Sequence, residues 1–291
     1  MTRSIPFIDT ISQVDPARPA LYCDKEQRWT SYGDLARQVV SAAQLYSGRD
    51  RRLAFLVFSN TRRDVAAYLG LLAAGHVVAL IDPKLDADLL QRLLERYRPE
   101  MVVGERAAQP ASFWTSIRGS PTAAWERPDG HEPPLHPDLC LLLTTSGSTG
   151  SSKMVRLSAE ALGHNTDAIR QTLAIDERTR AVAHLPLHYS YGLSILHSHL
   201  LAGASLVLTD KTMLEADFWS LLRTEECTSL PGTPFHYRMM DRLGLDRLDV
   251  PTLSVLTQAG GRLEPDLVCA MHKVMAARGG RFYVMYGQTE A

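Results

Sequence analysis

The chain has 291 residues, of which 45% are hydrophobic and 22% charged, a composition typical of a folded globular protein rather than a disordered one. Its formal net charge of -1 argues against a protein that mainly coats nucleic acid or an anionic membrane. No apolar run reaches the roughly 18 residues of a membrane helix, and the N-terminus lacks the pattern of a secretory signal. Because its four cysteines are far apart and form no CxxC pair, we expect reduced thiols in a cytoplasmic protein.

The first part of the chain alternates short apolar runs with segments of helical periodicity. We expect strands at 53–58, 77–81 and 101–103, and helices at 61–74 and 86–97. Strands and helices that alternate with short connections imply parallel pairing through right-handed crossovers. The pattern therefore predicts an α/β fold.

A proline-rich stretch follows, because six of the 16 prolines lie between Gly104 and Pro137. We interpret residues 105–137 as a long irregular connection, with a short helix near 113–117, between a first α/β subdomain (1–104) and a second (138–291). In the second subdomain we expect strands at 139–145, 181–185, 205–208, 228–230, 253–257 and 282–285, and helices at 159–173, 218–223 and 264–278.

The strongest local signal is the segment Thr145-Ser-Gly-Ser-Thr-Gly-Ser-Ser-Lys153, which follows an apolar strand. Its glycines let backbone N–H groups turn toward one point, and its hydroxyls add donors, so the loop suits phosphate oxygens. A Ser/Gly-rich surface hairpin is the alternative for a loop of this composition. The segment 145–153 is not a Walker A loop, because Ser152 precedes the lysine and a β-like stretch follows. This argues against a P-loop kinase or ATPase.

This segment resembles the phosphate loop of the adenylate-forming superfamily, which comprises acyl- and aryl-CoA synthetases, adenylation domains of nonribosomal peptide synthetases, and luciferases. Ser152 stands where the family has proline, and Met154 where it has glycine. Five further segments match family elements in the same order: Trp29–Leu35, Leu71–Pro83, Leu185–Leu193, Gln258–Leu263 and Tyr286–Glu290. The resemblance implies the N-terminal domain of the adenylate-forming fold, with two stacked, parallel-rich sheets and flanking helices.

The family continues beyond the last of these motifs, with an aspartate for the ribose and a mobile C-terminal domain that carries a lysine. This sequence stops one residue after the motif. We therefore expect a piece of a longer protein that has little or no activity by itself.

The resemblance implies that the chain binds ATP or AMP together with Mg²⁺. It also implies the following roles for individual residues. The residues implied to bind the phosphates are Thr145, Ser146, Gly147, Ser148, Thr149, Gly150 and Lys153. Those implied to bind the adenine are Gly260, Gly261, Arg262 and Tyr286, with Gly287 and Gln288 beside them. Thr289 reaches the α-phosphate, and Glu290 is a hard carboxylate suited to Mg²⁺. The residues implied to be catalytic are Thr149, Lys153, Thr289 and Glu290. The residues implied to bind the carboxylic acid substrate are His188, Tyr189, Tyr191, Gly192 and Gly232.

The substrate class follows from one absence in this sequence. Amino-acid-activating members place an aspartate in the segment that corresponds to His188–Tyr191, and this segment has no acidic residue. Since an unpaired ammonium group in an apolar pocket is costly, an aryl or fatty acid without an α-amino group is favoured. Tyr189 stands where many CoA synthetases have histidine.

We expect a ligase that forms an acyl-adenylate and pyrophosphate and then passes the acyl group to CoA or a carrier protein, with no nucleic-acid or membrane partner. The alternative is a catalytically silent nucleotide-binding or scaffolding module. His197 and His199 could suggest a metal, but no carboxylate or cysteine lies at ligand spacing, so we interpret them as packing or pocket residues.

Overall fold

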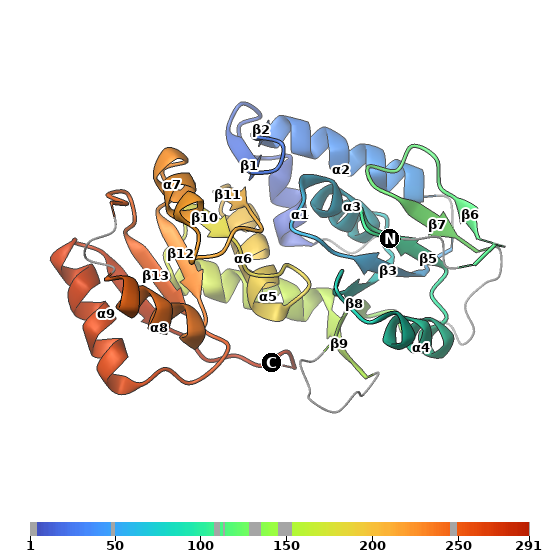
Figure 1. The fold of residues 1–291 in the computed structure, drawn as a ribbon. Coiled ribbons are helices and arrows are strands. Elements are labelled where there is room, and N and C mark those ends of the chain that lie inside the picture. The colour runs from blue at the N-terminus through green and yellow to red at the C-terminus, as the bar shows by residue number, and fades with distance from the viewer. Residues whose placement is uncertain are drawn as a thin grey trace.

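The computed structural model describes residues 5–47, 50–107, 111–112, 114–127, 135–144, 153–244 and 249–290. Its described strands form two seven-stranded sheets (Figure 1). Sheet A has the order β14 (Arg281–Val284), β13 (Val255–Gln258), β12 (Ser229–Gly232), β10 (Arg180–Ala183), β11 (Ser205–Leu208), β1 (Pro19–Cys23), β2 (Arg28–Ser31). Sheet B has the order β6 (Thr115–Ser116), β7 (Ala124–Glu126), β5 (Met101–Val103), β3 (Leu53–Val57), β4 (Val77–Ile81), β8 (Leu139–Thr144), β9 (Met154–Ser158).

Nine helices are described with these sheets: α1 (Pro6–Ile11), α2 (Tyr32–Tyr46), α3 (Arg62–Ala73), α4 (Ala87–Tyr97), α5 (Ala159–Thr172), α6 (Ser190–Leu201), α7 (Ala216–Thr224), α8 (Pro234–Leu243) and α9 (Pro265–Ala277). The central strands of both sheets run parallel, and β2, β6, β7 and β9 pair antiparallel. The predicted α/β class, with two parallel-rich sheets and flanking helices, is confirmed. None of the described helices is long and apolar enough to cross a membrane.

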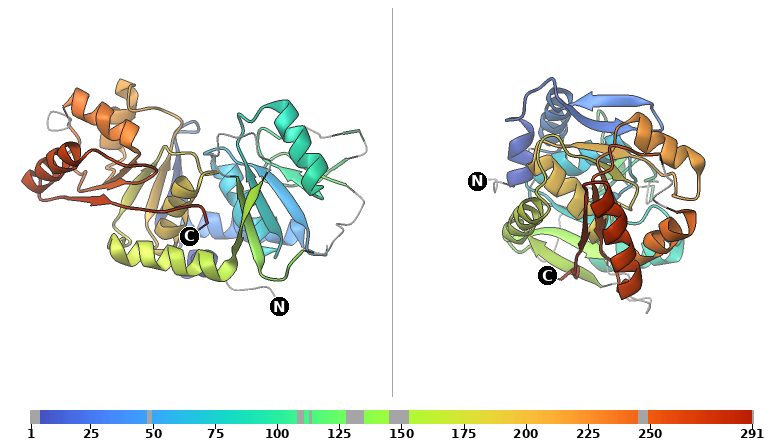
Figure 2. Two further views of the ribbon diagram at one scale, coloured as in Figure 1. Left: turned by 90° about the horizontal axis from the view of Figure 1, so that it is seen from below. Right: turned by 90° about the vertical axis from the view of Figure 1, so that its left-hand side faces the viewer.

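Helices lie between the two sheets and also cover their outer faces (Figure 2). Successive side chains of a strand point to opposite faces, so each central strand serves two cores. In sheet B, Leu56 packs in the core that contains α2, α3 and α6, whereas Phe55 packs toward α4. In sheet A, Leu206 faces the same central core, and Val207 faces the outer core with α7, α8 and α9. The central core therefore joins both sheets into one body.

Each sheet contains strands from both of the subdomains predicted from the sequence. Strands β1 and β2 come from the first 31 residues but lie in sheet A with strands from the second half of the chain. Strand β8 lies in sheet B, where Val78 pairs with Leu141 across β4 and β8. Pairing is set by these long-range contacts and not by order in the chain. The boundaries of independent domains at 1–104, 105–137 and 138–291 stay a prediction.

The short helix expected near 113–117 is wrong. Thr115–Ser116 form β6, which pairs antiparallel with β7, and the amide of Ile117 donates to the carbonyl of Ala124 at 2.9 Å. An apolar run of this length does not distinguish a helix from a strand, and here the neighbouring strand supplies the backbone partners. The segment that the sequence indicated as irregular therefore extends the edge of sheet B.

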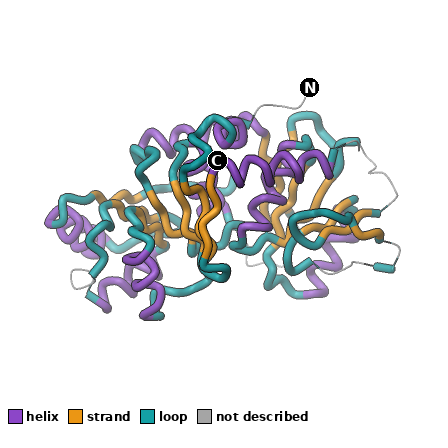
Figure 3. The backbone as a smooth tube through the Cα atoms, turned by 90° about the horizontal axis from the view of Figure 1, so that it is seen from above, coloured by secondary structure: helices purple, strands orange, loops and turns teal. Residues whose placement is uncertain are grey.

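The chain after β14 leaves sheet A and runs back toward the middle of the molecule (Figures 1 and 2), and the C mark also lies near the middle in Figure 3. There it lies beside α5 and α6, with which it lines a cavity. This course brings the last predicted motif, Tyr286–Glu290, to the central helices.

Candidate functional site

A cavity of about 230 Å³ lies where α5, α6 and the segment after β14 meet. Eight of the residues predicted to bind the nucleotide, the acid or Mg²⁺ line it: Tyr189, Tyr191, Gly260, Tyr286, Gly287, Gln288, Thr289 and Glu290. They come from three separate sequence motifs. The remainder of the wall is mostly apolar and includes Leu143, Leu157, Leu162, Ile169 and Met285.

Parallel pairing of β13 with β14 places two of these motifs next to each other. Gln258 is in register with Val284, so both chains leave sheet A at its carboxyl edge, where ligands bind in open α/β sheets. The turn after β13 has positive φ at Gly260 (81°) and Gly261 (154°), which favours glycine. The side-chain amide of Gln258 donates to the carbonyl of Gly261 at 2.8 Å and holds this turn.

Tyr191 anchors α6 to sheet A. Its hydroxyl donates to the carbonyl of Thr257 at 2.7 Å, and it is buried. Burial raises the pKa of Tyr191, so the hydroxyl stays protonated and remains a donor. At the N-terminus of α6, the hydroxyl of Thr289 lies 3.5 Å from that of Ser190. These contacts bring the segment His188–Tyr191 and the last motif, Tyr286–Glu290, to one side of the cavity.

Asn60, which the sequence did not indicate, connects the two sheets at the stretch of chain that precedes His188–Tyr191. It follows β3, and its buried amide nitrogen donates to the carbonyls of Ala183 (3.1 Å) and Leu185 (2.9 Å). Its amide oxygen accepts from the backbone N–H of Leu187 at 3.0 Å. All three contacts fix the chain that leads from β10 into α6. A polar residue within a few positions of the end of a buried strand is the signal that would have indicated it.

Several predicted site residues lie outside the lining of this cavity. His188 Nε2 is 3.6 Å from Asp82 Oδ2, and burial lowers the pKa of His188 although Asp82 opposes that shift. A Cβ atom on Gly192 would lie 2.2 Å from the carbonyl oxygen of Pro186, and one on Gly232 would lie 3.0 Å from the Tyr237 ring. Both glycines permit close packing at these points.

The other predicted residues that the structure describes lie in two exposed places. Gly261 and Arg262 lie in the exposed turn after β13, and Lys153 is exposed at the residue before β9. Residues 145–152, which include the predicted phosphate ligands from Thr145 to Gly150, lie outside the described residues.

Tyr286 and Glu290 suit a nucleotide and its metal. The side chain of Tyr286 is 86% exposed, which leaves its ring available for stacking, and the amide of Gln288 donates to its hydroxyl at 2.6 Å. Within the described ranges, no three His, Cys, Asp or Glu side chains are grouped to hold a metal by themselves. Mg²⁺ is usually bound by one or two carboxylates together with phosphate oxygens, so the single exposed carboxylate of Glu290 fits that chemistry.

His197 and His199 point away from each other because they are two residues apart on α6. His197 stacks on Phe7, with ring centroids 4.0 Å apart, and its Nε2 lies 2.9 Å from the hydroxyl of Tyr68. His199 faces a second, smaller cavity. The two side chains therefore do not converge on one ion.

Two parallel-rich sheets joined by central helices, with a cavity that collects three motifs near the carboxyl edge of sheet A, are the architecture expected for an adenylate-forming enzyme. A sequence model of the AMP-binding enzyme family matches residues 8–291. The chain belongs to the AMP-binding enzyme family.

Among curated relatives, the chain is 25% identical over 288 residues to phenyloxazoline synthase MbtB of Mycobacterium tuberculosis, covering 96% of this chain and 20% of the synthase. It is also 25% identical over 232 residues to surfactin synthase subunit 1 of Bacillus subtilis, covering 75% of this chain and 6% of that protein. The chain thus spans a small part of these relatives.

A similar solved structure is the N-terminal subdomain of NpsA from Klebsiella oxytoca in complex with 3-hydroxyanthranilyl-AMSN. It superimposes with a TM-score of 0.78 at 19% identity, covering 99% of this chain and 73% of that one. At this identity, the likeness shows the shared fold.

Proposed function

We propose that a protein containing this chain joins ATP to a carboxylic acid without an α-amino group, aryl or fatty, to form an acyl-adenylate and pyrophosphate. The observation that carries the proposal is the single cavity lined by both Tyr189–Tyr191 and Tyr286–Glu290. A carboxylate oxygen attacks the α-phosphorus, and the bond to the β-phosphate oxygen breaks as pyrophosphate leaves. The acyl group then passes to CoA or to a carrier protein.

The residues act by positioning and by offsetting charge, because the reaction brings two anions together. In this proposal Thr289 contacts the α-phosphate and Lys153 the outer phosphates, while Tyr286 and the glycine turn at 260–261 bind the adenine. Glu290 would hold Mg²⁺, which when bound would further neutralise the phosphate charge. Tyr189 and Tyr191 line the part of the cavity that receives the acid.

The absence of any acidic side chain in His188–Tyr191 supports an acid without an α-amino group. The structurally similar NpsA subdomain is bound to a hydroxyanthranilyl compound, which supports the aryl class. The two synthases, of which this chain covers 6% and 20%, support a carrier protein as the acceptor, and CoA is the other acceptor to be tested.

The test is carboxylate-dependent exchange of labelled pyrophosphate into ATP by the full-length protein that contains this chain, which is also the protein in which the variants below are made, with panels of aryl, fatty and amino acids. We expect exchange with aryl or fatty acids and none with amino acids. Nucleotide binding without exchange for any acid would instead support the silent binding module.

Replacement of Lys153 by alanine should lower the exchange activity, kcat/KM, by about 10- to 100-fold. The expected loss corresponds to about 1.5–3 kcal/mol for one charge-assisted phosphate contact. Lys273→Ala, at an exposed position of α9, is the matched control and should retain full activity. Equal exchange by the Lys153→Ala variant and the unaltered protein would show that this lysine is not at the phosphates.

A further inference from the structure

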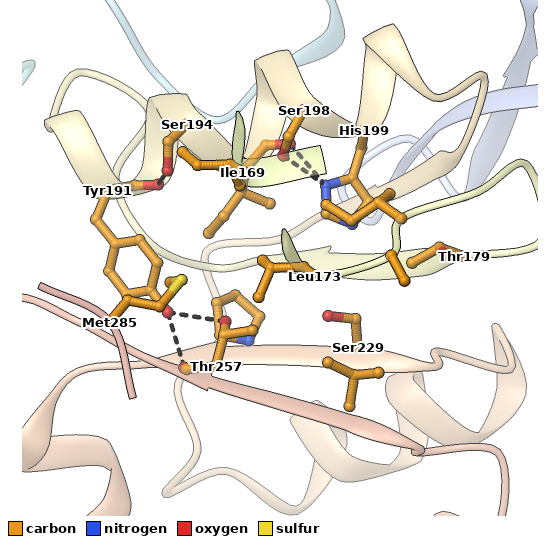
Figure 4. A pocket seen from close by; sticks show the side chains of 15 residues that line it. Ile169, Leu173, Thr179, Tyr191, Ser194, Ser198, His199, Ser229, Thr257 and Met285 are labelled. Carbon is orange, nitrogen blue, oxygen red and sulfur yellow. Dashed lines mark hydrogen bonds between the residues drawn. The ribbon is translucent and has the colours of Figure 1, made fainter. Parts of the chain in front are cut away.

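A second cavity, of about 30 Å³, lies behind the first, between α6, the C-terminal end of α5 and the strands β12 and β13 (Figure 4). Its walls are largely apolar, with Leu173, Ile175 and Val255 among them. The ring of His199 projects from α6 into this space, and the hydroxyl-bearing side chain of Ser229 lies on the wall formed by β12 (Figure 4).

The hydrogen bonds of His199 define which of its nitrogens carries the proton. Nδ1 lies 2.8 Å from the carbonyl oxygen of Ile195, and since a carbonyl can only accept, Nδ1–H is the donor. The residue is 4% exposed, and burial lowers its pKa to about 4, so the ring is neutral near pH 7. Nε2 therefore carries no proton and can only accept a hydrogen bond.

That acceptor has no partner within the described part of the protein, although it is buried. A buried acceptor without a donor costs about 1–3 kcal/mol. Several polar neighbours are already engaged, because Ser194 donates to the carbonyl of Tyr191 at 2.8 Å and Thr257 lies 2.9 Å from the hydroxyl of Tyr191. The hydroxyl of Ser229 also lines this space, but it makes no hydrogen bond with Nε2 of His199. The geometry thus leaves a place for a donor that comes from outside the protein.

The cavity selects a small, uncharged donor. None of the described residues that line it is Asp, Glu, Lys or Arg, so an ammonium group would be buried without a counter-ion. About 30 Å³ accommodates one or two non-hydrogen atoms, since one water needs roughly 10–15 Å³. A hydroxyl or a neutral amino group fits these limits.

The small cavity adjoins the proposed acid site. Ile169, Tyr191, Ser194 and Met285 line both cavities. Met285 is unbranched and changes rotamer readily, so its side chain can turn aside for a ligand that extends from one cavity into the other. A carboxylate held near the nucleotide end of the larger cavity would direct the far end of its acid toward His199.

We propose that the acid carries a hydroxyl or neutral amino group at the end remote from its carboxylate, and that this group donates a hydrogen bond to Nε2 of His199. The inference rests on the proposed function and makes His199 a specificity residue of that site. A site built to hydrogen-bond a substrate group rejects the analogue that lacks it, because its own acceptor is left unpaired.

Matched pairs of acids test this in the exchange reaction. Hydroxybenzoic and aminobenzoic acids are compared with fluoro- and methylbenzoic acids of the same substitution, and ω-hydroxy fatty acids with unsubstituted ones. We expect at least one donor-bearing acid to exceed its counterpart by 10- to 100-fold in kcat/KM. Equal values within every pair would overturn the inference and leave the proposed function standing, with a water alone in the small cavity. Failure of every acid would overturn both.

Two variants of His199 make the assignment to this residue specific. His199→Leu removes the acceptor and should erase the preference within the pair, while His199→Gln retains an acceptor and should keep part of it. His164→Leu, at an exposed position of α5, should keep the preference in full. A preference that survives unchanged in His199→Leu would overturn the assignment, and the comparison of acids on the unaltered protein does not depend on either variant folding.

Discussion

Acidification from pH 7.5 to pH 5 should lower the free energy of unfolding by roughly 4–6 kcal/mol. Three histidines cause this effect: burial lowers the pKa to about 4 for the partly buried His184, and to about 3 and about 4 for the buried His197 and His199, against an ordinary value of 6.5. Below pH 6.5 the unfolded chain takes up protons that the native histidines do not. Each histidine then costs about 2 kcal/mol of stability at pH 5.

Asp64 acts in the opposite direction but does not cancel the loss. Burial raises its pKa to about 6, although it accepts hydrogen bonds from the backbone of Ser59 and Glu105 and from Thr122. Between its ordinary pKa of 3.8 and about 6, the native carboxyl group holds more proton than the unfolded one, so stability from this group rises as the pH falls. The recovery between pH 7.5 and pH 5 is about 1–1.5 kcal/mol.

Urea unfolding followed by circular dichroism at pH 7.5, 6.5, 5.5 and 5 measures the effect. His197→Gln, which cannot take up a proton, should remove about a third of the pH dependence. His164→Gln, at an exposed position, is the matched control and should leave it unchanged. A free energy of unfolding that is constant over this range would show that the three histidines are not buried in neutral form.

Asn60→Ala should destabilise the protein by about 3–5 kcal/mol. The substitution leaves the carbonyls of Ala183 and Leu185 and the N–H of Leu187 without their side-chain partner. Each buried polar group left unpaired costs about 1–3 kcal/mol, and the losses overlap because the three groups are adjacent. Since the affected chain leads into Tyr189 and Tyr191, the acid site should also lose order.

Thermal and urea unfolding of this variant give the stability change, and KM for the acid in the exchange reaction gives the effect on the site. Asn165→Ala, an exposed asparagine on α5, is the matched control for stability and should change it by less than about 0.5 kcal/mol. A loss below about 1 kcal/mol in Asn60→Ala would contradict the bridging role of this side chain.

Elements with a clear period or a clear end signal were predictable from the sequence. The predicted helix at 86–97 corresponds to α4, which begins after Asp86, whose carboxylate accepts from the amides of Asp88 and Leu89. The helix α6 was not predicted, because it is buried on nearly all sides and its sequence has no polar stripe to reveal a helical period. Its ends are also unmarked, since Tyr189 provides no side-chain cap.

The hairpin of β1 and β2 was missed because no local signal fixes its place, whereas the helix α2 was missed although its start has a local signal. The hairpin gains its place from long-range pairing, with Leu21 beside Leu206, which no local pattern indicates. The helix α2 does have a local signal, because Ser31 caps it by accepting from the amide of Asp34.

The candidate site shows the same division between local and long-range information. Motifs gave Tyr189, Tyr191 and the run Tyr286–Glu290, which line one cavity. Asn60 was not indicated, and His199 was interpreted only as a packing or pocket residue, because their roles depend on partners far along the chain or on an empty space beside them. Sequence spacing contains neither kind of information.

Calorimetric titration of this chain with a non-hydrolysable aryl-adenylate analogue tests most directly the claim that one cavity holds both the nucleotide and the acid. We predict one site per chain, displaced by AMP, with a Kd at least 100-fold lower than that of AMP or of the free acid, because the linked halves bind together without a second loss of translational freedom. Binding no tighter than AMP, or binding that AMP does not displace, would contradict the account.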